Sequence, residues 1–279
     1  MDRLLLCTDM DRTVIPNGHQ PEHPDARKRF SKLCNLPQVQ LVYVTGRHLQ
    51  LVRQAIDDYR LPMPACAITD VGTRIYQQEE GQWREILSWQ EQIAPDWGGK
   101  THAQLERALA GMEGLILQEE IKQNDFKLSY YMPLDANQRA IGERIEQRLM
   151  QLGMDASLVW SIDEPQRIGL LDLLPRNATK MHGIEFLYHY LGLEREEVIF
   201  AGDSGNDLSV LGSSIRSIVV ANADPEVKQQ ALQQATENGW PETLYLAREE
   251  AGPLGGNYAA GVLQGVFHYA PSIVNKVNP

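Results

Sequence analysis

The chain has 279 residues, of which 43% are hydrophobic and 23% are charged. This size allows one large or two modest globular domains, each with a buried core. The formal net charge is −11 and the pI is about 5.1, which argues against the basic face that nucleic-acid binding needs. A phosphoester would also be repelled by this charge, so a phosphate-binding site here would need local cations and a metal.

The three cysteines, Cys7, Cys34 and Cys66, are far apart, and two of them lie in apolar runs. Scattered cysteines of odd number argue against a disulfide framework, so we expect free thiols in a reducing compartment. No apolar run approaches the roughly 18 residues of a membrane-spanning helix, and residues 1–11 carry charges that a signal peptide would lack. We expect a cytoplasmic protein that binds neither membranes nor nucleic acid.

Short apolar runs alternate with helical patterns at both ends of the chain. This order implies right-handed crossovers and a doubly wound parallel sheet of the α/β class. The expected strands lie at 4–8, 39–44, 65–69, 198–201 and 217–220, and the expected helices at 25–33, 48–59 and 180–191.

The middle of the chain, residues 82–174, is richer in Glu, Gln and Trp. Its pattern predicts a small α+β module with its own sheet, inserted into a core made of residues 1–81 and 175–279. The expected helices and strands of this module lie at 101–110, 137–152, 127–132 and 157–162.

Two carboxylates, Asp9 and Asp11, follow the expected strand 4–8. In open α/β sheets, ligands bind at the carboxyl ends of strands, where the strand order reverses. Carboxylates there suit Mg²⁺, which prefers oxygen ligands, and a carboxylate can attack phosphorus to form an aspartyl phosphate. Taken alone, the pattern is more often a solvated turn or a helix cap.

A second acidic pair, Asp203 and Asp207, lies in a glycine-containing loop directly after the expected strand 198–201. Two carboxylates four residues apart at the end of a strand are typical of a divalent-cation site. The loop lacks the EF-hand pattern and its closing Glu, so a calcium-binding hand is excluded.

Hydroxyl and cationic groups are expected at the same edge of the sheet. Thr45, Gly46 and Arg47 follow the second expected strand. The Thr45 hydroxyl could hold a phosphoryl oxygen, and Gly46 would allow close approach of a ligand. Lys180 begins a helix, where the helix dipole disfavours a cation unless an anion is near. An N-cap at Thr45 and a solvated Lys180 remain alternative interpretations.

In this order, the four elements resemble the motifs of the haloacid dehalogenase superfamily of phosphatases. The gap between the second and third motifs is where subfamily IIB inserts its larger, C2-type α+β cap, so the resemblance implies that cap on a Rossmann-like core. The likeness extends over nearly the whole chain. The matching segments are Asp9-Met10-Asp11-Arg12-Thr13, Thr45-Gly46-Arg47, Lys180 and Gly202 to Asp207.

A closer likeness is to the sucrose-phosphatase group. Arg12 and Arg74 depart from its usual residues, which are small or His at the first position and often acidic at the second. The segments similar to that group are Ala67 to Tyr76, Lys127 to Tyr131, Leu171 to Pro175, Ala178 to Lys180, Gly202 to Asp207 and Asn257 to Leu263.

The resemblance implies a Mg²⁺-dependent phosphatase with Asp9 as the nucleophile. Asp11 would protonate the leaving oxygen and then activate water. Thr45 and Lys180 would neutralise the phosphoryl oxygens. The ligands implied for Mg²⁺ are Asp9, the Asp11 backbone carbonyl, Asp203 and, directly or through water, Asp207.

The implied substrate is a small sugar phosphate, with sucrose 6-phosphate favoured. A surface lysine is the alternative interpretation of Lys127, and Trp83, Trp89, Trp97 and Trp160 are better explained by packing than by sugar stacking. The residues expected to bind substrate are Thr45, Gly46, Arg47, Lys127, Lys180 and Asn206.

Other functions stay open. The same motifs suit a phosphatase for mannosylfructose phosphate or for mannosyl- or glucosyl-3-phosphoglycerate, and a sugar-phosphate mutase uses the same nucleophile. A catalytically silent glycosyltransferase partner would be free to lose the nucleophile or the lysine, and both are present. We expect a monomer, and association with a sugar-phosphate synthase remains open.

Overall fold

The computed structural model of the protein describes residues 3–163, 166–250 and 254–277. Met1 and Asp2, on which the expectation about the N-terminus partly rests, lie outside these ranges. The chain divides into two compact units. The core unit comprises Met1–Glu85 and Lys180–Pro279, and the inserted unit comprises Ile86–Thr179.

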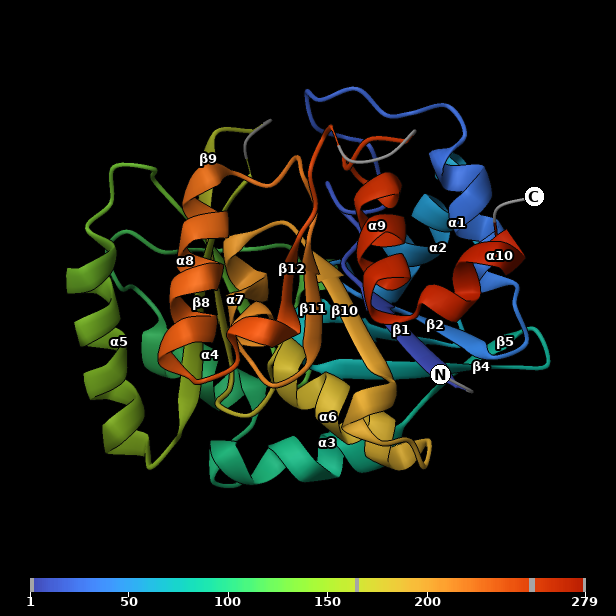
Figure 1. The fold of residues 1–279 in the computed structure, drawn as a ribbon. Helices are drawn as coiled ribbons and strands as arrows, with labels where there is room; N and C mark the ends of the chain where they lie inside the picture. The colour runs from blue at the N-terminus through green and yellow to red at the C-terminus, as the bar shows by residue number, and fades with distance from the viewer. Residues whose placement is uncertain (1–2, 164–165, 251–253, 278–279) are drawn as a thin grey trace. The chain divides into compact units, whose positions relative to one another are not determined.

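The core unit is built on one mostly parallel sheet with the strand order β12-β11-β10-β1-β2-β3-β4-β5 (Figure 1). Strands β12 to β3 run parallel, and β4 and β5 form an antiparallel extension that the sequence pattern did not predict. The expected doubly wound α/β core is confirmed. Its strands are β1 (Leu4–Thr8), β2 (Val39–Val44), β3 (Cys66–Thr69), β4 (Arg74–Glu79), β5 (Gln82–Glu85), β10 (Val198–Gly202), β11 (Arg216–Val219) and β12 (Leu244–Leu246).

Both faces of this sheet are covered by helices. Every residue of β1 is buried, because Leu4 and Leu6 pack into the cluster that includes α1, α2, α9 and α10 and the other face is covered by α6, α7 and α8. The three cysteines are free thiols. The helices are α1 (Ala26–Cys34), α2 (Leu49–Tyr59), α6 (Lys180–Tyr190), α7 (Leu208–Leu211), α8 (Pro225–Glu237), α9 (Ala259–Tyr269) and α10 (Val274–Val277).

The strand order reverses between β1 and β10. From β1 the chain continues to β2 and β3 on one side, and after the insertion it returns to β10, β11 and β12 on the other side. The carboxyl ends of β1 and β10 therefore flank the switch point, the place where open α/β sheets bind ligands.

The inserted unit has a separate antiparallel sheet with the strand order β6-β7-β9-β8. Helices α4 and α5 contribute to its apolar core together with Trp97, whose buried ring favours packing over sugar binding. Both helices begin at side-chain caps, a capping box at Thr101 and an N-cap at Asn137. The elements are α3 (Leu87–Ile93), α4 (His102–Leu109), α5 (Gln138–Leu152), β6 (Ile116–Leu117), β7 (Leu128–Met132), β8 (Ala156–Asp163) and β9 (Ile168–Pro175).

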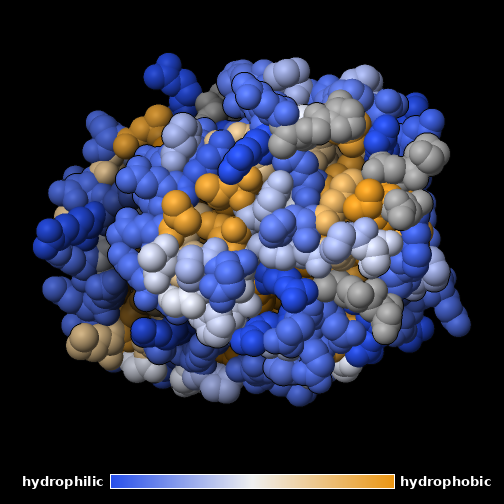
Figure 2. Space-filling model, viewed as in Figure 1, coloured by the Kyte–Doolittle hydropathy of each residue, from blue (hydrophilic) through white to orange (hydrophobic). Residues whose placement is uncertain are grey.

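Polar residues prevail on the molecular face that Figure 2 shows, where hydrophobic residues form small separate groups. None of the helices within the described ranges has the length and apolar character needed to cross a membrane.

Candidate active site

Asp9 is placed by the strand that precedes it. Its backbone N–H donates to the carbonyl of Ala201 at 2.8 Å, which extends the pairing of β1 with β10 by one residue. Asp9 is only 5% exposed. A buried carboxylate thus sits at the switch point of the sheet.

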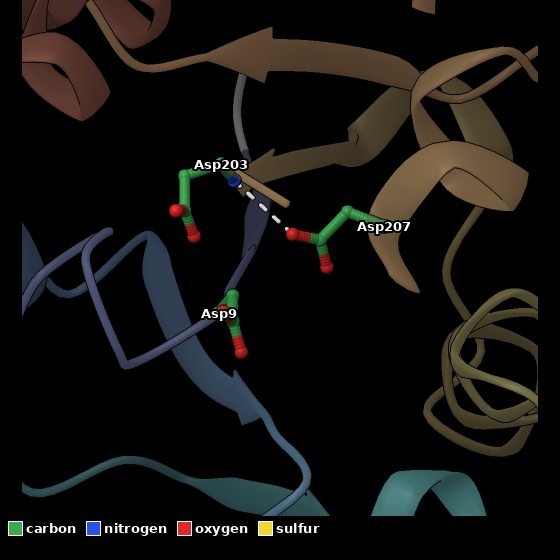
Figure 3. A group of neighbouring side chains, drawn as sticks. All are labelled: Asp9, Asp203 and Asp207. Carbon is green, nitrogen blue, oxygen red and sulfur yellow. Dashed lines mark hydrogen bonds between the residues drawn. The ribbon is translucent and has the colours of Figure 1, made fainter. Parts of the chain in front are cut away.

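Asp203 and Asp207 approach Asp9 from the loop after β10 (Figure 3). The short turn η5 (Gly205–Asp207) folds back, so Asp207 Oδ2 accepts from the backbone N–H groups of Asp203 and Ser204, both at 3.1 Å. One carboxylate oxygen from each of Asp9, Asp203 and Asp207 lies within 4.8 Å of the others. Three buried carboxylates therefore face one small volume.

Lys180 supplies a cation to this group. It is the first residue of α6, and its Nζ lies 3.1 Å from Asp9 Oδ1 and 2.7 Å from Asp207 Oδ1. Nζ also donates to Asn206 Oδ1 at 3.1 Å. The anionic partner expected for a lysine at a helix N-terminus is present, and Lys180 is not the solvated side chain of the alternative interpretation.

The charges of the group are strongly coupled. Burial, together with the charges of Asp207 and Asp11, raises the pKa of Asp9 to about 7 although Lys180 opposes the rise. Burial and the neighbouring Asp9 and Asp207 likewise raise the pKa of Asp203 to about 8. Burial by itself would lower the pKa of Lys180, but Asp207 and Asp9 raise it well above its usual value.

These residues fit a divalent cation. Carboxylate oxygens are the ligands that Mg²⁺ prefers, and the burial of Asp9, Asp203 and Asp207 makes three negative charges costly unless cations lie close to them. A buried group of Asp9, Asp203 and Asp207 that could hold a metal agrees with the predicted cofactor. The Asp11 side chain does not belong to this group. Asp11 was predicted to bind the metal through its backbone carbonyl, so that prediction is not affected.

The Asp11 side chain is bound elsewhere. Arg47 Nε lies 2.7 Å from Asp11 Oδ2 and Arg47 Nη2 lies 2.6 Å from Oδ1, while Asn17 Nδ2 donates to Oδ1 at 2.8 Å. Asp11 and Arg47 are both half-buried. The sequence predicted Arg47 as a substrate contact and gave no signal for Asn17.

Thr45 lies at the end of β2, the neighbour of β1, and is almost fully buried. The loop beneath it has two non-glycine residues in the left-handed region, Asp70 at φ 53° and Val71 at φ 62°. Their backbone N–H groups donate to the carbonyls of Arg47 (3.0 Å) and Thr45 (3.2 Å). A left-handed conformation is rare for a β-branched residue such as Val71. Here it places the two N–H groups so that they hydrogen-bond to the Thr45-Gly46-Arg47 turn.

Two further contacts to Asp203 were missed by sequence reasoning. The Thr13 hydroxyl donates to Asp203 Oδ1 at 3.1 Å, and Arg12 Nε lies 3.3 Å from Oδ2. Thr13 belongs to the first motif, which was the available signal. Lys127 is buried in the inserted unit, and its predicted contact with substrate remains a prediction.

The sequence is similar to known phosphatases over almost its whole length. A sequence model of the sucrose-6F-phosphate phosphohydrolase family matches residues 2–270. A protein of Nitrosococcus oceani that is described as a HAD-like hydrolase is 46% identical to this chain. The match covers 96% of this chain and 72% of the other protein. Mannosylfructose-phosphate phosphatase of Agrobacterium fabrum is 30% identical over 82% of this chain and 87% of its own length.

Among solved structures, the sucrose-phosphatase of Synechocystis sp. PCC6803 in complex with sucrose and phosphate superposes with a TM-score of 0.75. The identity is 25%, and the match covers 96% of this chain and 98% of the other. The family match, the fold and the buried group of Asp9, Asp203 and Asp207 all point to a phosphohydrolase. The chain belongs to the sucrose-6F-phosphate phosphohydrolase family, and its fold is that of the subfamily IIB sugar phosphatases of the haloacid dehalogenase superfamily.

Proposed function

We propose that this protein hydrolyses sucrose 6-phosphate to sucrose and phosphate, with Mg²⁺ and through an aspartyl-phosphate intermediate. The position of Asp9 carries the proposal. Its buried carboxylate lies at the switch point, with Oδ1 3.1 Å from Lys180 Nζ, in a chain of a phosphohydrolase family.

In the first step, an Asp9 oxygen attacks phosphorus in line, and the bond from phosphorus to the sugar oxygen breaks. Asp11 donates a proton to that leaving oxygen. In the second step, Asp11 takes a proton from water as the water oxygen attacks phosphorus, which frees Asp9 and releases inorganic phosphate.

Charge neutralisation supplies most of the catalysis in phosphoryl transfer. Lys180 neutralises negative charge on the phosphoryl oxygens and the Thr45 hydroxyl donates a hydrogen bond to one of them, while Mg²⁺, when bound, would supply the largest positive charge. The proposed metal ligands are Asp9, the Asp11 backbone carbonyl, Asp203 and Asp207, and the proposed contacts to the rest of the substrate are Gly46, Arg47, Asn206 and Lys127.

A second candidate substrate is mannosylfructose phosphate. The relative from Agrobacterium fabrum that bears this substrate in its name is 30% identical to this chain. Both candidates are phosphorylated disaccharides that contain fructose, so the same core chemistry would serve either one. Glycosyl-3-phosphoglycerates, a mutase reaction and a silent partner of a glycosyltransferase have less support.

The test is phosphate release by the purified protein from sucrose 6-phosphate, mannosylfructose phosphate, glycosyl-3-phosphoglycerates and simple hexose phosphates. We expect the highest kcat/KM for sucrose 6-phosphate and loss of activity on chelation of Mg²⁺. Preference for another sugar would replace the substrate and keep the mechanism. A folded, Mg²⁺-bound protein that releases no phosphate from any of them would instead favour the silent partner. Gel filtration would test the proposed monomer.

A further inference from the structure

Arg12 occupies an unusual backbone position between two motif residues. Its φ is 56°, in the left-handed region that non-glycine residues rarely adopt. Its N–H donates to Asn17 Oδ1 at 2.8 Å, and its carbonyl accepts from Asn222 Nδ2 at 2.6 Å. Asn222 is buried and also accepts the backbone N–H of Tyr258 at 2.7 Å. Side chains on both sides therefore hold Arg12 in this conformation.

The guanidinium of Arg12 forms ion pairs with two aspartates, the buried Asp203 and the exposed Asp224. Nε lies 3.3 Å from Asp203 Oδ2, and Nη2 lies 3.2 Å from Asp224 Oδ1. The Asp203 side chain is 3% exposed and the Asp224 side chain is 64% exposed. Water screens the outer pair far more than the inner pair, so Arg12 acts mainly on Asp203.

Two cations pair with the three carboxylates that could hold the metal. Lys180 pairs with Asp9 and Asp207, and Arg12 pairs with Asp203. Three carboxylates and two cations give a local charge of about −1 when all are ionised. Without Arg12 that charge would be about −2.

We propose that Arg12 is an internal counter-ion of the metal site, which weakens Mg²⁺ binding and strengthens phosphate binding once Mg²⁺ is present. This inference rests on the Mg²⁺ dependence proposed above. A fixed positive charge next to Asp203 repels an incoming cation. The same charge leaves the loaded site at about +1 rather than neutral, which attracts a phosphate dianion.

The opposite signs of these two effects separate an electrostatic role from a structural one. Loss of a merely structural contact would misplace Asp203 and weaken both ligands. Loss of a counter-ion strengthens the binding of Mg²⁺ and weakens the binding of phosphate.

The test is calorimetric titration of the wild type and of Arg12→Gln with MgCl₂, and then with inorganic phosphate at saturating Mg²⁺. We expect Arg12→Gln to bind Mg²⁺ about three- to tenfold more tightly and phosphate about three- to tenfold more weakly. Arg12→Lys retains the positive charge and should lie closer to the wild type than Arg12→Gln does for both ligands. Arg3→Gln is the matched control, because it removes an arginine that pairs with Glu197 at the surface of the core unit.

Weaker or unchanged Mg²⁺ binding in a folded Arg12→Gln protein would overturn the inference. If the wild type itself bound no Mg²⁺, the proposed metal dependence would fail and this inference with it. Should Arg12→Gln not fold, Arg12→Met provides the second test, because it keeps an unbranched side chain and removes the charge. That variant should also bind Mg²⁺ about three- to tenfold more tightly, and weaker or unchanged binding would count against the counter-ion.

Discussion

Arg47 holds the Asp11 carboxylate with two hydrogen bonds, from Nε to Oδ2 at 2.7 Å and from Nη2 to Oδ1 at 2.6 Å. Such a paired contact fixes the plane of a carboxylate as well as its position. Since Asp11 is proposed to transfer protons in both steps, Arg47 would act on catalysis by positioning Asp11, in addition to its proposed contact with substrate.

We therefore expect Arg47→Lys to lower kcat by about ten- to a hundredfold with a smaller change in KM, because misplaced catalytic groups lose rates of this order. Arg53→Ala, an exposed change on α2, is the control. Steady-state kinetics distinguish this role from a direct contact with substrate. A raised KM with an unchanged kcat would show that Arg47 acts only through its proposed contact with substrate, and would contradict the positioning role.

Two glycines of the acidic loop give a matched pair of variants. A Cβ at Gly202 would lie 2.5 Å from Asp207 Oδ2, whereas a Cβ at Gly205 would meet nothing within 4 Å. We expect Gly202→Ala to weaken Mg²⁺ binding by about ten- to a hundredfold, since Asp207 must move, and Gly205→Ala to have little effect. Titration of activity with MgCl₂ tests this pair. Equal behaviour of the two variants would contradict the role of Asp207.

The acidic group also predicts how stability depends on pH. In the folded protein the pKa of Asp9 rises from an ordinary 3.8 to about 7, and that of Asp203 from 3.8 to about 8. At a pH between the ordinary value and the raised one, each group therefore holds its proton in the folded state and has lost it in the unfolded state. The free energy of unfolding of the metal-free protein should then fall as pH rises from 5 to 8, by up to roughly 1 kcal/mol per pH unit for each group.

Thermal unfolding in EDTA at pH 5, 6, 7 and 8 measures this dependence. Asp203→Asn should make Tm depend less on pH, because one of the two titrating groups is removed. In separate samples without EDTA, added Mg²⁺ should raise Tm more at pH 8 than at pH 5, because metal ligands must be deprotonated. A slope that is the same in Asp203→Asn and the wild type would rule out this origin.

The sequence predicted the site where local pattern determines position. Asp9 and Asp203 each follow a buried strand, and adjacent parallel strands bring such residues to one edge of the sheet. Lys180 was predicted from its place at a helix start. These features are properties of short segments and of the order of elements.

Contacts between distant segments were not predictable in this way. The pair of Arg12 with Asp203 joins residues 191 positions apart, and neither side chain carries a local signal for the other. The antiparallel strands β4 and β5 were missed because their residues are mostly polar and half-exposed, which weakens the alternation that marks a strand.

Asp9 is proposed as the nucleophile of a Mg²⁺-dependent sugar phosphatase. The most direct measurement compares phosphate release from sucrose 6-phosphate by the wild type and by Asp9→Asn at saturating Mg²⁺, with circular dichroism to verify folding. We expect release by the wild type and none above background by the folded variant. Release by Asp9→Asn at the wild-type rate would contradict this role of Asp9.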